Sequence, residues 1–334
     1  MVVKMLIIGS HVSYKNSTQL LGSVEEAITY GANAFMFYTG APQNTQRGEI
    51  NDLVTYEALQ KMKENNIMLE NVVCHAPYIV NLANNIDPEK YEFAKKFLRQ
   101  EIERCMQLGV RKIVLHPGSA TKLDRTDALQ KEIYQNKVDK GFNVTDVNKE
   151  FCLTYGEIAE AYDAWRKKKD DLGEELADVA IYLLGLSEIL GINLEELKYI
   201  IENIKLKEKI GVCLDTCHLS DSGININEFD KYLDEFDKKI GIDKIGCVHL
   251  NDSKNPIGVR KDRHENLGYG TIGFDTLINV AYNARLESVP KLLETPFVDR
   301  EYAPYKFEIE EIRNKKFNPN LYDEIVSYYR GTNE

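Results

Sequence analysis

The sequence predicts an α/β fold in which parallel strands form a barrel that lacks about one strand–helix unit. Three observations predict it. Short apolar stretches are continuous, as expected for strands covered on both faces. Helical patterns lie between them, and this alternation is typical of parallel sheets and barrels. The strands recur roughly every 30–45 residues, except across one gap of about 90 residues between Gly118 and Ile210.

Seven stretches have the composition of buried strands: 6–12, 34–39, 71–77, 112–118, 210–218, 244–252 and 290–296. An eight-stranded barrel takes about 250 residues, which leaves roughly 80 of the 334 residues over. The long gap should hold the eighth strand, but even its best candidate, VAIYLLGL (179–186), continues a helical spacing. We therefore expect seven strands, with a helical insertion in place of the missing unit.

The stretch YEFAKKFLRQEIERCMQLG (91–109) is the clearest example of a helix between strands. Its apolar residues recur at helical spacing, and Gly109 is a stop signal. The residues expected on its buried face are Phe93, Phe97, Ile102, Cys105 and Leu108.

Composition excludes some classes of protein. The first apolar run is too short to span a membrane and no cleavage site follows it, so we expect a cytoplasmic protein without membrane partners. The net charge of −11 gives no support to nucleic-acid binding, although bound metals could reverse the sign locally. Without C-x-x-C pairs, free buried thiols are expected at Cys74, Cys105, Cys152, Cys213, Cys217 and Cys247.

Histidines gather at the predicted strand ends. Five of the six, His11, His75, His116, His218 and His249, lie there, and His264 follows in a loop beside Asp262. The same strand ends carry Asp215, Asn251 and Glu294. In α/β barrels the carboxyl ends of the strands form the active-site face. Imidazoles and carboxylates without thiolates suit Zn, Mn or Fe, and a multi-metal site suits phosphodiester hydrolysis through an activated water.

These motifs resemble the endonuclease IV family of apurinic/apyrimidinic endonucleases. The resemblance rests on GSHVS, FMFYTGAPQNT, HAPYIVNLAN, LHPGSA, GVCLDTCH, HLNDSK, DRHENLGYG and LLETP, and it covers residues 5–124 and about 193–320. It implies a TIM-type barrel with up to three zinc ions that cleaves double-stranded DNA on the 5′ side of abasic sites through metal-bound hydroxide.

The family's site residues carry over by motif. The implied metal ligands are His75, His116, Asp215, His218, His249, Asp262, His264 and Glu294, and among them Glu294, Asp215 and His249 are the implied catalytic residues. The implied DNA contacts are His11, Tyr78, Asn251 and Arg47, with Gln46 as an alternative to Arg47. A ninth ligand, a glutamate that bridges two zinc ions in a segment like ETMAG or ENTAG, is absent from the sequence. Its absence predicts weaker zinc binding and impaired activity.

The helical insertion carries two pairs of carboxylates three residues apart. Glu157 and Glu160 share one helix face, and Glu175 and Asp178 share another. Exposed acidic faces commonly show this spacing, but four converging carboxylates would suit Mg²⁺. The segment also resembles a MazG-type nucleotide pyrophosphohydrolase through KGF, E-x-x-E and EELADV over roughly 126–195. That resemblance implies a Mg²⁺ site, nucleoside triphosphate substrates and a possible dimer.

The expected organisation is therefore a barrel from 1–124 and 193–334 interrupted by a helical domain at 125–192. A natural fusion and a recombined or artificial chimera would both produce this pattern. The function predicted first is a zinc-dependent DNA repair endonuclease. The alternatives are a Mg²⁺-dependent pyrophosphohydrolase acting through the inserted helices, and a metal-dependent binder of damaged DNA without catalysis.

Overall fold

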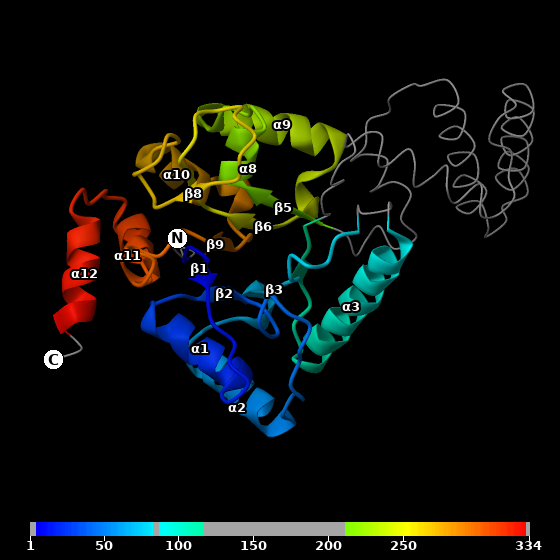
Figure 1. Ribbon diagram of the computed structural model, residues 1–334. Coiled ribbons are helices and arrows are strands. Elements are labelled where there is room, and N and C mark those ends of the chain that lie inside the picture. Colours follow the sequence, from blue (N-terminus) through cyan, green and yellow to red (C-terminus); the bar gives the residue numbers. More distant parts are fainter. Residues whose placement is uncertain (1–4, 83–86, 117–210, 332–334) are drawn as a thin grey trace, which may run out of the picture. The chain divides into compact units, whose positions relative to one another are not determined.

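A computed structural model describes residues 5–82, 87–116 and 211–331 of the chain (Figure 1). The chain divides into two compact units, one of residues 1–79, 98–115 and 211–334 and the other of residues 80–97 and 116–210. The strands described below all belong to the first unit. The predicted helical domain at 125–192, its boundaries and the expected position of the eighth strand lie outside the described residues, so the proposed organisation stays a prediction.

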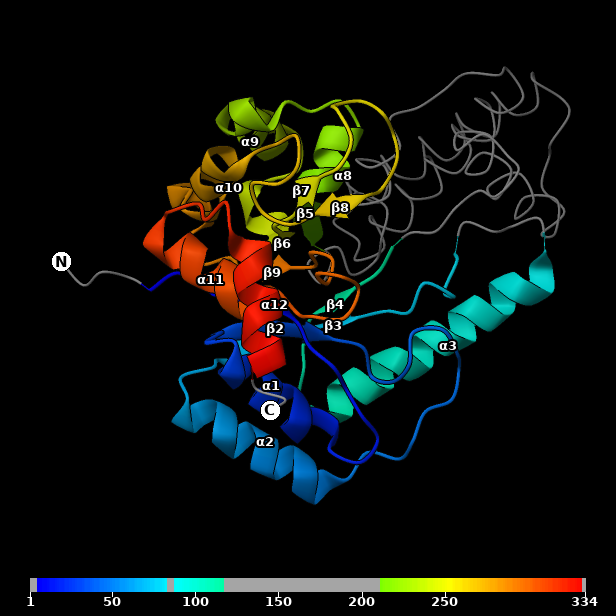
Figure 2. The ribbon, with the colours of Figure 1, turned by 60° about the vertical axis from the view of Figure 1, so that its left-hand side comes forward.

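A seven-stranded parallel sheet forms the centre of the first unit (Figures 1 and 2). Its strands follow the order β4-β3-β2-β1-β9-β6-β5, so β4 and β5 are its edges among the described strands. A strand lies within each of the seven predicted stretches, and the α/β barrel class is confirmed. The strands are β1 (Ile8–His11), β2 (Ala34–Phe37), β3 (Val72–His75), β4 (Ile113–Val114), β5 (Val212–Asp215), β6 (Ile245–His249) and β9 (Lys291–Leu293).

Both faces of the sheet are buried, which explains the continuous apolar runs. Successive residues of a strand face opposite sides. In β2, Phe35 and Phe37 pack into the larger core, and Met36 belongs to a smaller cluster with Ala34, Val73, Cys247 and Leu292. The two clusters therefore lie on opposite faces of the same strands.

Helices and short antiparallel strands complete the described residues. The small pair β7 (Asp252–Ser253) and β8 (His264–Glu265) follows the end of β6. The 3₁₀ helices are η1 (Leu69–Asn71), η3 (Ile226–Glu228), η4 (Ile242–Lys244) and η5 (Ala284–Leu286). The α-helices are α1 (Gln19–Thr29), α2 (Asp52–Glu64), α3 (Pro88–Gln107), α8 (Thr216–Asp221), α9 (Phe229–Lys239), α10 (Phe274–Ala281), α11 (Tyr305–Asn314) and α12 (Leu321–Gly331). Among these helices, none has the length and apolar character to cross a bilayer.

The helix predicted at 91–109 is α3, and its buried face differs from the predicted one. Gly109 ends the helical segment with a positive φ of 77°, as expected for a stop. Phe93 and Ile102 are instead exposed, at 46% and 41%. Glu101 is fully buried, where it accepts hydrogen bonds from Arg47 and Thr39. The apolar-stripe prediction was wrong at Phe93 and Ile102, because a salt-bridged carboxylate lies on the buried face.

Candidate metal centre

The strand ends bring predicted site residues to one edge of the sheet. His11, His75, Asp215 and His249 are the last residues of β1, β3, β5 and β6. Glu294 directly follows β9. Because the neighbouring strands are parallel, their carboxyl ends point the same way, and these side chains lie at a common edge.

The DTCH motif is a strand end followed by a helix start. The predicted strand 210–218 was too long, since β5 ends at Asp215 and α8 begins at Thr216. The Asp215 carboxylate accepts from the backbone N–H groups of Cys217 at 2.8 Å and His218 at 3.0 Å, as an N-cap residue does. His218 is therefore displayed by the first turn of α8 and not by a strand end.

One group of possible ligands contains Asp215, His249 and Glu294. The Nδ1 atom of His249 lies 2.8 Å from Glu294 Oε2 and 3.6 Å from Asp215 Oδ2. One ligand atom of each residue lies within 4.8 Å of the others. Two carboxylates and an imidazole at this spacing could hold a divalent cation.

A second group contains His218, Asp262 and His264. The Oδ1 atom of Asp262 lies 3.2 Å from His218 Nε2 and 3.3 Å from His264 Nε2. The same His264 nitrogen lies 3.6 Å from Asp215 Oδ2. Asp215 therefore lies between the two groups, where its carboxylate could contact a cation held by either.

Asn251 links the Asp215 carboxylate to the backbone of Glu294. Its Nδ2 donates to Asp215 Oδ2 at 2.9 Å, and its Oδ1 accepts from the backbone N–H of Glu294 at 2.9 Å. The Thr216 hydroxyl in turn donates to the Asn251 carbonyl at 2.6 Å. The predicted role of Asn251 was a DNA contact. The structure places its side chain in the interior, with no exposed surface.

Charges within the centre shift one another's pKa. Burial alone lowers the pKa of His249, but the neighbouring Glu294 charge raises it well above the usual range. Burial lowers the pKa of His218, and the hydrogen bond to Asp262 outweighs it, so the pKa rises to about 9. Burial raises the pKa of Glu294, but the charge of His249 outweighs this effect, so the pKa lies well below the usual range. The carboxylates therefore stabilise positive charge here, which a metal ion would supply in place of protons.

A group of aromatic rings adjoins the centre. His75 lies with its ring centroid 6.2 Å from that of His249, and its Nδ1 lies 2.7 Å from the Ala76 carbonyl. The Tyr38 ring lies 4.8 Å from His11 and 5.0 Å from His75. Tyr78 lies 5.6 Å from His75 and is 60% exposed, so it presents an aromatic surface beside the centre.

Sequence analysis did not single out Tyr38, which lies among the rings of His11, His75 and Tyr78. Its position directly after β2, within the motif FMFYTG, was the available signal. A residue that follows a parallel strand reaches the same edge as the ligands on neighbouring strands. Cys217, fully buried with Sγ near Asp215 and His264, was also missed.

Three further predicted residues are described by the structure. Arg47 is buried, with 1% of its side chain exposed, and its Nε donates to Glu101 at 2.6 Å. Gln46, the alternative DNA contact, is exposed. His116 comes two residues after β4, belongs to the second compact unit and is half-buried. The four carboxylates predicted to bind Mg²⁺ lie outside the described residues, so that site, its nucleotide substrates and the dimer stay predictions: Glu157, Glu160, Glu175 and Asp178.

Comparison with known protein families and sequences gives a consistent result. A family model described as a xylose isomerase-like TIM barrel matches residues 24–315. A probable endonuclease 4 of Ureaplasma urealyticum is 47% identical over 328 residues, with 96% of this chain and 97% of that protein covered. A probable endonuclease 4 of Bacillus subtilis is 42% identical over 328 residues, with 96% and 99% covered.

A comparison with solved structures supports the fold. The crystal structure of endonuclease IV from Thermus thermophilus matches with a TM-score of 0.61 at 23% identity, covering 92% of this chain and 97% of that one. At this identity the structural match shows only a common fold. The family relationship rests on the more similar sequences.

Proposed function

The chain belongs to the endonuclease IV family, with the fold of a xylose isomerase-like TIM barrel, and from this premise we propose that it is a DNA repair endonuclease. Its relatives are named endonucleases, and the chain is accordingly a phosphodiester hydrolase. We further propose that it depends on zinc and hydrolyses the phosphodiester on the 5′ side of abasic sites in double-stranded DNA.

The observation that carries this proposal is the pair of ligand groups joined by Asp215. Their donor atoms are imidazole nitrogens and carboxylate oxygens, a set that zinc accepts. The buried Nε2 atom of His264, in the second group, lacks a hydrogen-bond partner among the described residues. When bound, zinc supplies an activated water and stabilises charge on the phosphodiester oxygens.

The chain's own residues hold and orient this centre. Asp215 and Glu294 provide negative charge in a buried setting, with 6% of the Asp215 residue exposed. Asn251 bonds to the Asp215 carboxylate and to the backbone N–H of Glu294, and so positions the Asp215 carboxylate relative to the segment that carries Glu294. The hydrogen bonds from α8 to the Asp215 carboxylate occupy its Oδ1, which leaves Oδ2 facing His249 and His264. The net charge of −11 is compatible with an anionic substrate only if bound cations dominate the local field.

Tyr78 supplies a surface for DNA. Its ring is exposed, while its neighbours His75 and Tyr38 are packed behind it. An aromatic ring can stack against a base or fill the space left by a displaced nucleotide. An abasic nucleotide is displaced more easily than an intact one, because it has lost its stacking and pairing interactions, and this difference favours damaged DNA.

The proposal is tested with a DNA duplex that contains one synthetic abasic site. We expect nicking on the 5′ side of the lesion that stops on chelation and returns when zinc is added back. Glu294→Gln should reduce nicking by orders of magnitude, and Glu310→Gln, which changes an exposed glutamate on α11, is the matched control.

The outcome also separates the alternatives. Binding of abasic duplex without nicking would indicate a damage recogniser instead of an enzyme. Release of pyrophosphate from deoxynucleoside triphosphates that is lost in Glu160→Ala would indicate activity of the inserted helices. Chelator-insensitive nicking, or none, would contradict the zinc-dependent endonuclease.

A further inference from the structure

Two thiols lie one layer below the candidate metal centre. Cys213 on β5 and Cys247 on β6 are register partners across the two strands. Each precedes a member of the centre by two residues, Cys213 before Asp215 and Cys247 before His249. Residues two apart on a strand share a face. The thiols therefore continue the ligand-bearing face into the interior.

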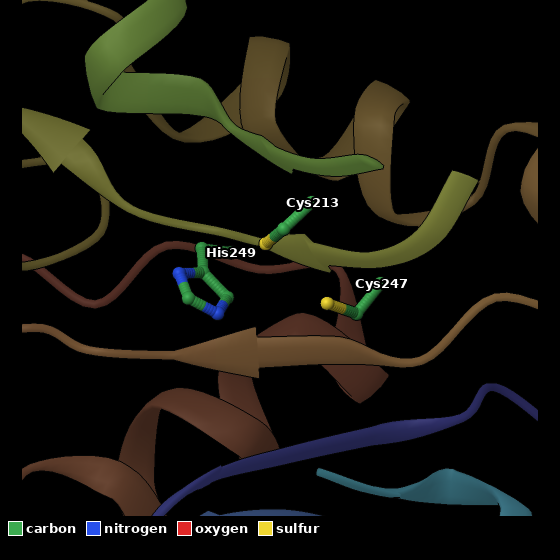
Figure 3. Close-up of side chains that lie close together, drawn as sticks. All are labelled: Cys213, Cys247 and His249. Atoms are coloured by element: carbon green, nitrogen blue, oxygen red, sulfur yellow. The ribbon is translucent and has the colours of Figure 1, made fainter. Parts of the chain in front are cut away.

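The thiols and the His249 imidazole form a compact group (Figure 3). The two Sγ atoms and one ring nitrogen of His249 all lie within 4.8 Å of one another. Figure 3 shows the three side chains directed into the same space between the strands. Cys247 is 3% exposed and Cys213 is half-buried at the edge strand β5.

The two ring nitrogens of His249 have different surroundings. Its Nδ1 lies against Glu294 and Asp215. Its Nε2 is buried and has no hydrogen-bond partner within the part of the chain that the structure describes. A buried imidazole nitrogen without a partner is unfavourable, and coordination of a cation would satisfy it.

The chemistry of this group differs from that of the centre above it. Thiolate ligands select soft cations, whereas the carboxylates of the upper centre suit harder ones. The surrounding side chains are apolar, among them Met36, Val73 and Leu292. Two thiolates balance the charge of one divalent cation, which suits burial in such a layer.

We propose that Cys213, Cys247 and His249 form a binding site for a thiophilic divalent cation, separate from the nitrogen and oxygen centre above it. Binding replaces the two thiol protons by one cation. Where Nδ1 of His249 already holds a cation of the upper centre, the proton on Nε2 is replaced as well, and all of these protons leave to solvent. The imidazole of His249 would then connect the two sites. Only this last consequence rests on the proposed function, because cation binding by the thiols is independent of DNA cleavage.

Cadmium is the probe that tests the site. Reduced, zinc-loaded full-length protein is titrated with Cd²⁺ while the ultraviolet charge-transfer absorption of thiolate-bound cadmium is recorded. We expect saturation at one such cadmium ion per chain, with X-ray absorption showing two sulfur ligands. The double substitution Cys213→Ala/Cys247→Ala should abolish the signal.

Cys74→Ala/Cys105→Ala is the matched control, because these two thiols are also buried and interact with each other. They form no ligand group with a histidine among the described residues, so this variant should keep the full signal. Cys213→Ala alone removes one half-buried thiol and should lower the sulfur count from two to one, which provides a test if the double variant fails to fold.

An undiminished cadmium signal in Cys213→Ala and in the double variant would overturn the proposal. The same holds if the signal disappears in Cys217→Ser, because that would place the cation at the group of Asp215, Cys217 and His264. Nicking of abasic DNA by the zinc-loaded protein is measured in parallel. Its absence would count against the proposed function and leave the cadmium result unaffected.

Discussion

Asn251 shows how a single residue fixes the geometry of the centre. Its amide bonds to the Asp215 carboxylate on one side and to the Glu294 backbone on the other. Residues of this kind, which orient the ligands of a metal, commonly change metal affinity or activity by about 10–100-fold when mutated.

We therefore expect Asn251→Ala to lower zinc affinity and nicking rate by about 10-fold or more. The measurements are competition with a zinc chelator and single-turnover nicking of abasic duplex. Asn279→Ala, which alters an exposed asparagine on α10, is the control and should behave as wild type. Equal zinc affinity in Asn251→Ala and the control would refute the positioning role.

A second substitution, at Tyr78, tests the proposed contact with DNA. Its exposed ring lies beside the centre and belongs to neither ligand group. Tyr78→Ala should weaken binding of abasic duplex by about 1–3 kcal/mol, the usual contribution of base–aromatic stacking. Zinc content should not change, and Tyr78→Phe should retain most of the affinity.

Tyr56→Ala removes a tyrosine of similar exposure from α2 and serves as the matched control for fluorescence-anisotropy binding. If Tyr78→Ala and Tyr56→Ala bind abasic duplex equally well, Tyr78 does not contact the DNA.

Among the elements, α11 connects the segment that carries Glu294 to the segment that carries His264 through hydrogen bonds. Its buried Glu308 accepts hydrogen bonds from the Asn266 side chain and the Leu267 backbone, both at 3.1 Å, and from the Thr295 hydroxyl. Burial raises the pKa of Glu308 to about 7. One carboxyl group on a helix therefore joins the loop after β8 to the end of β9.

The raised pKa of Glu308 predicts a pH-dependent stability. Its folded-state pKa exceeds the ordinary value of 4.5, so the folded protein binds this proton more tightly than the unfolded chain does. The stabilisation is complete below pH 4.5 and is lost as the pH rises through about 7. Glu308→Gln keeps a neutral side chain at every pH. Its stability relative to wild type should rise between pH 5 and pH 8, by on the order of 1–3 kcal/mol.

Urea unfolding of Glu308→Gln, wild type and the exposed control Glu310→Gln at the two pH values measures this difference. The buried neighbour Glu311 is common to all three proteins, and burial is the main cause of its raised pKa. Only the smaller part that comes from the Glu308 charge is lost in Glu308→Gln. Parallel pH profiles for wild type and Glu308→Gln would show that Glu308 does not titrate in this range.

The strands, which are covered on both faces, could be predicted from the sequence. The buried face of α3 and the start of α8 could not, because polar side chains in the interior determine them. All seven strands read as continuous apolar runs because each contributes to two cores. The face of α3 was mispredicted because Glu101 is buried through its ion pair with Arg47, a contact 54 residues away that no local pattern contains. The start of α8 was missed because Asp215 was interpreted only as a ligand and not also as a helix cap.

At the scale of the whole molecule, topology explains why the site could be found from sequence. Parallel strands bring their carboxyl ends together, so residues as distant as His11 and Glu294 could be assigned to one edge. The finer arrangement depends on side-chain contacts that the sequence does not specify. Examples are the burial of Asn251 and the position of Tyr38 among the rings.

The zinc content of the purified protein shows whether the two ligand groups hold metal. Elemental analysis should find at least two zinc ions per chain, one for each ligand group. Asp215→Asn should reduce the content, because Asp215 contacts both His249 and His264. A wild-type protein that retains no zinc after removal of excess metal, or an unchanged content in Asp215→Asn, would contradict the account.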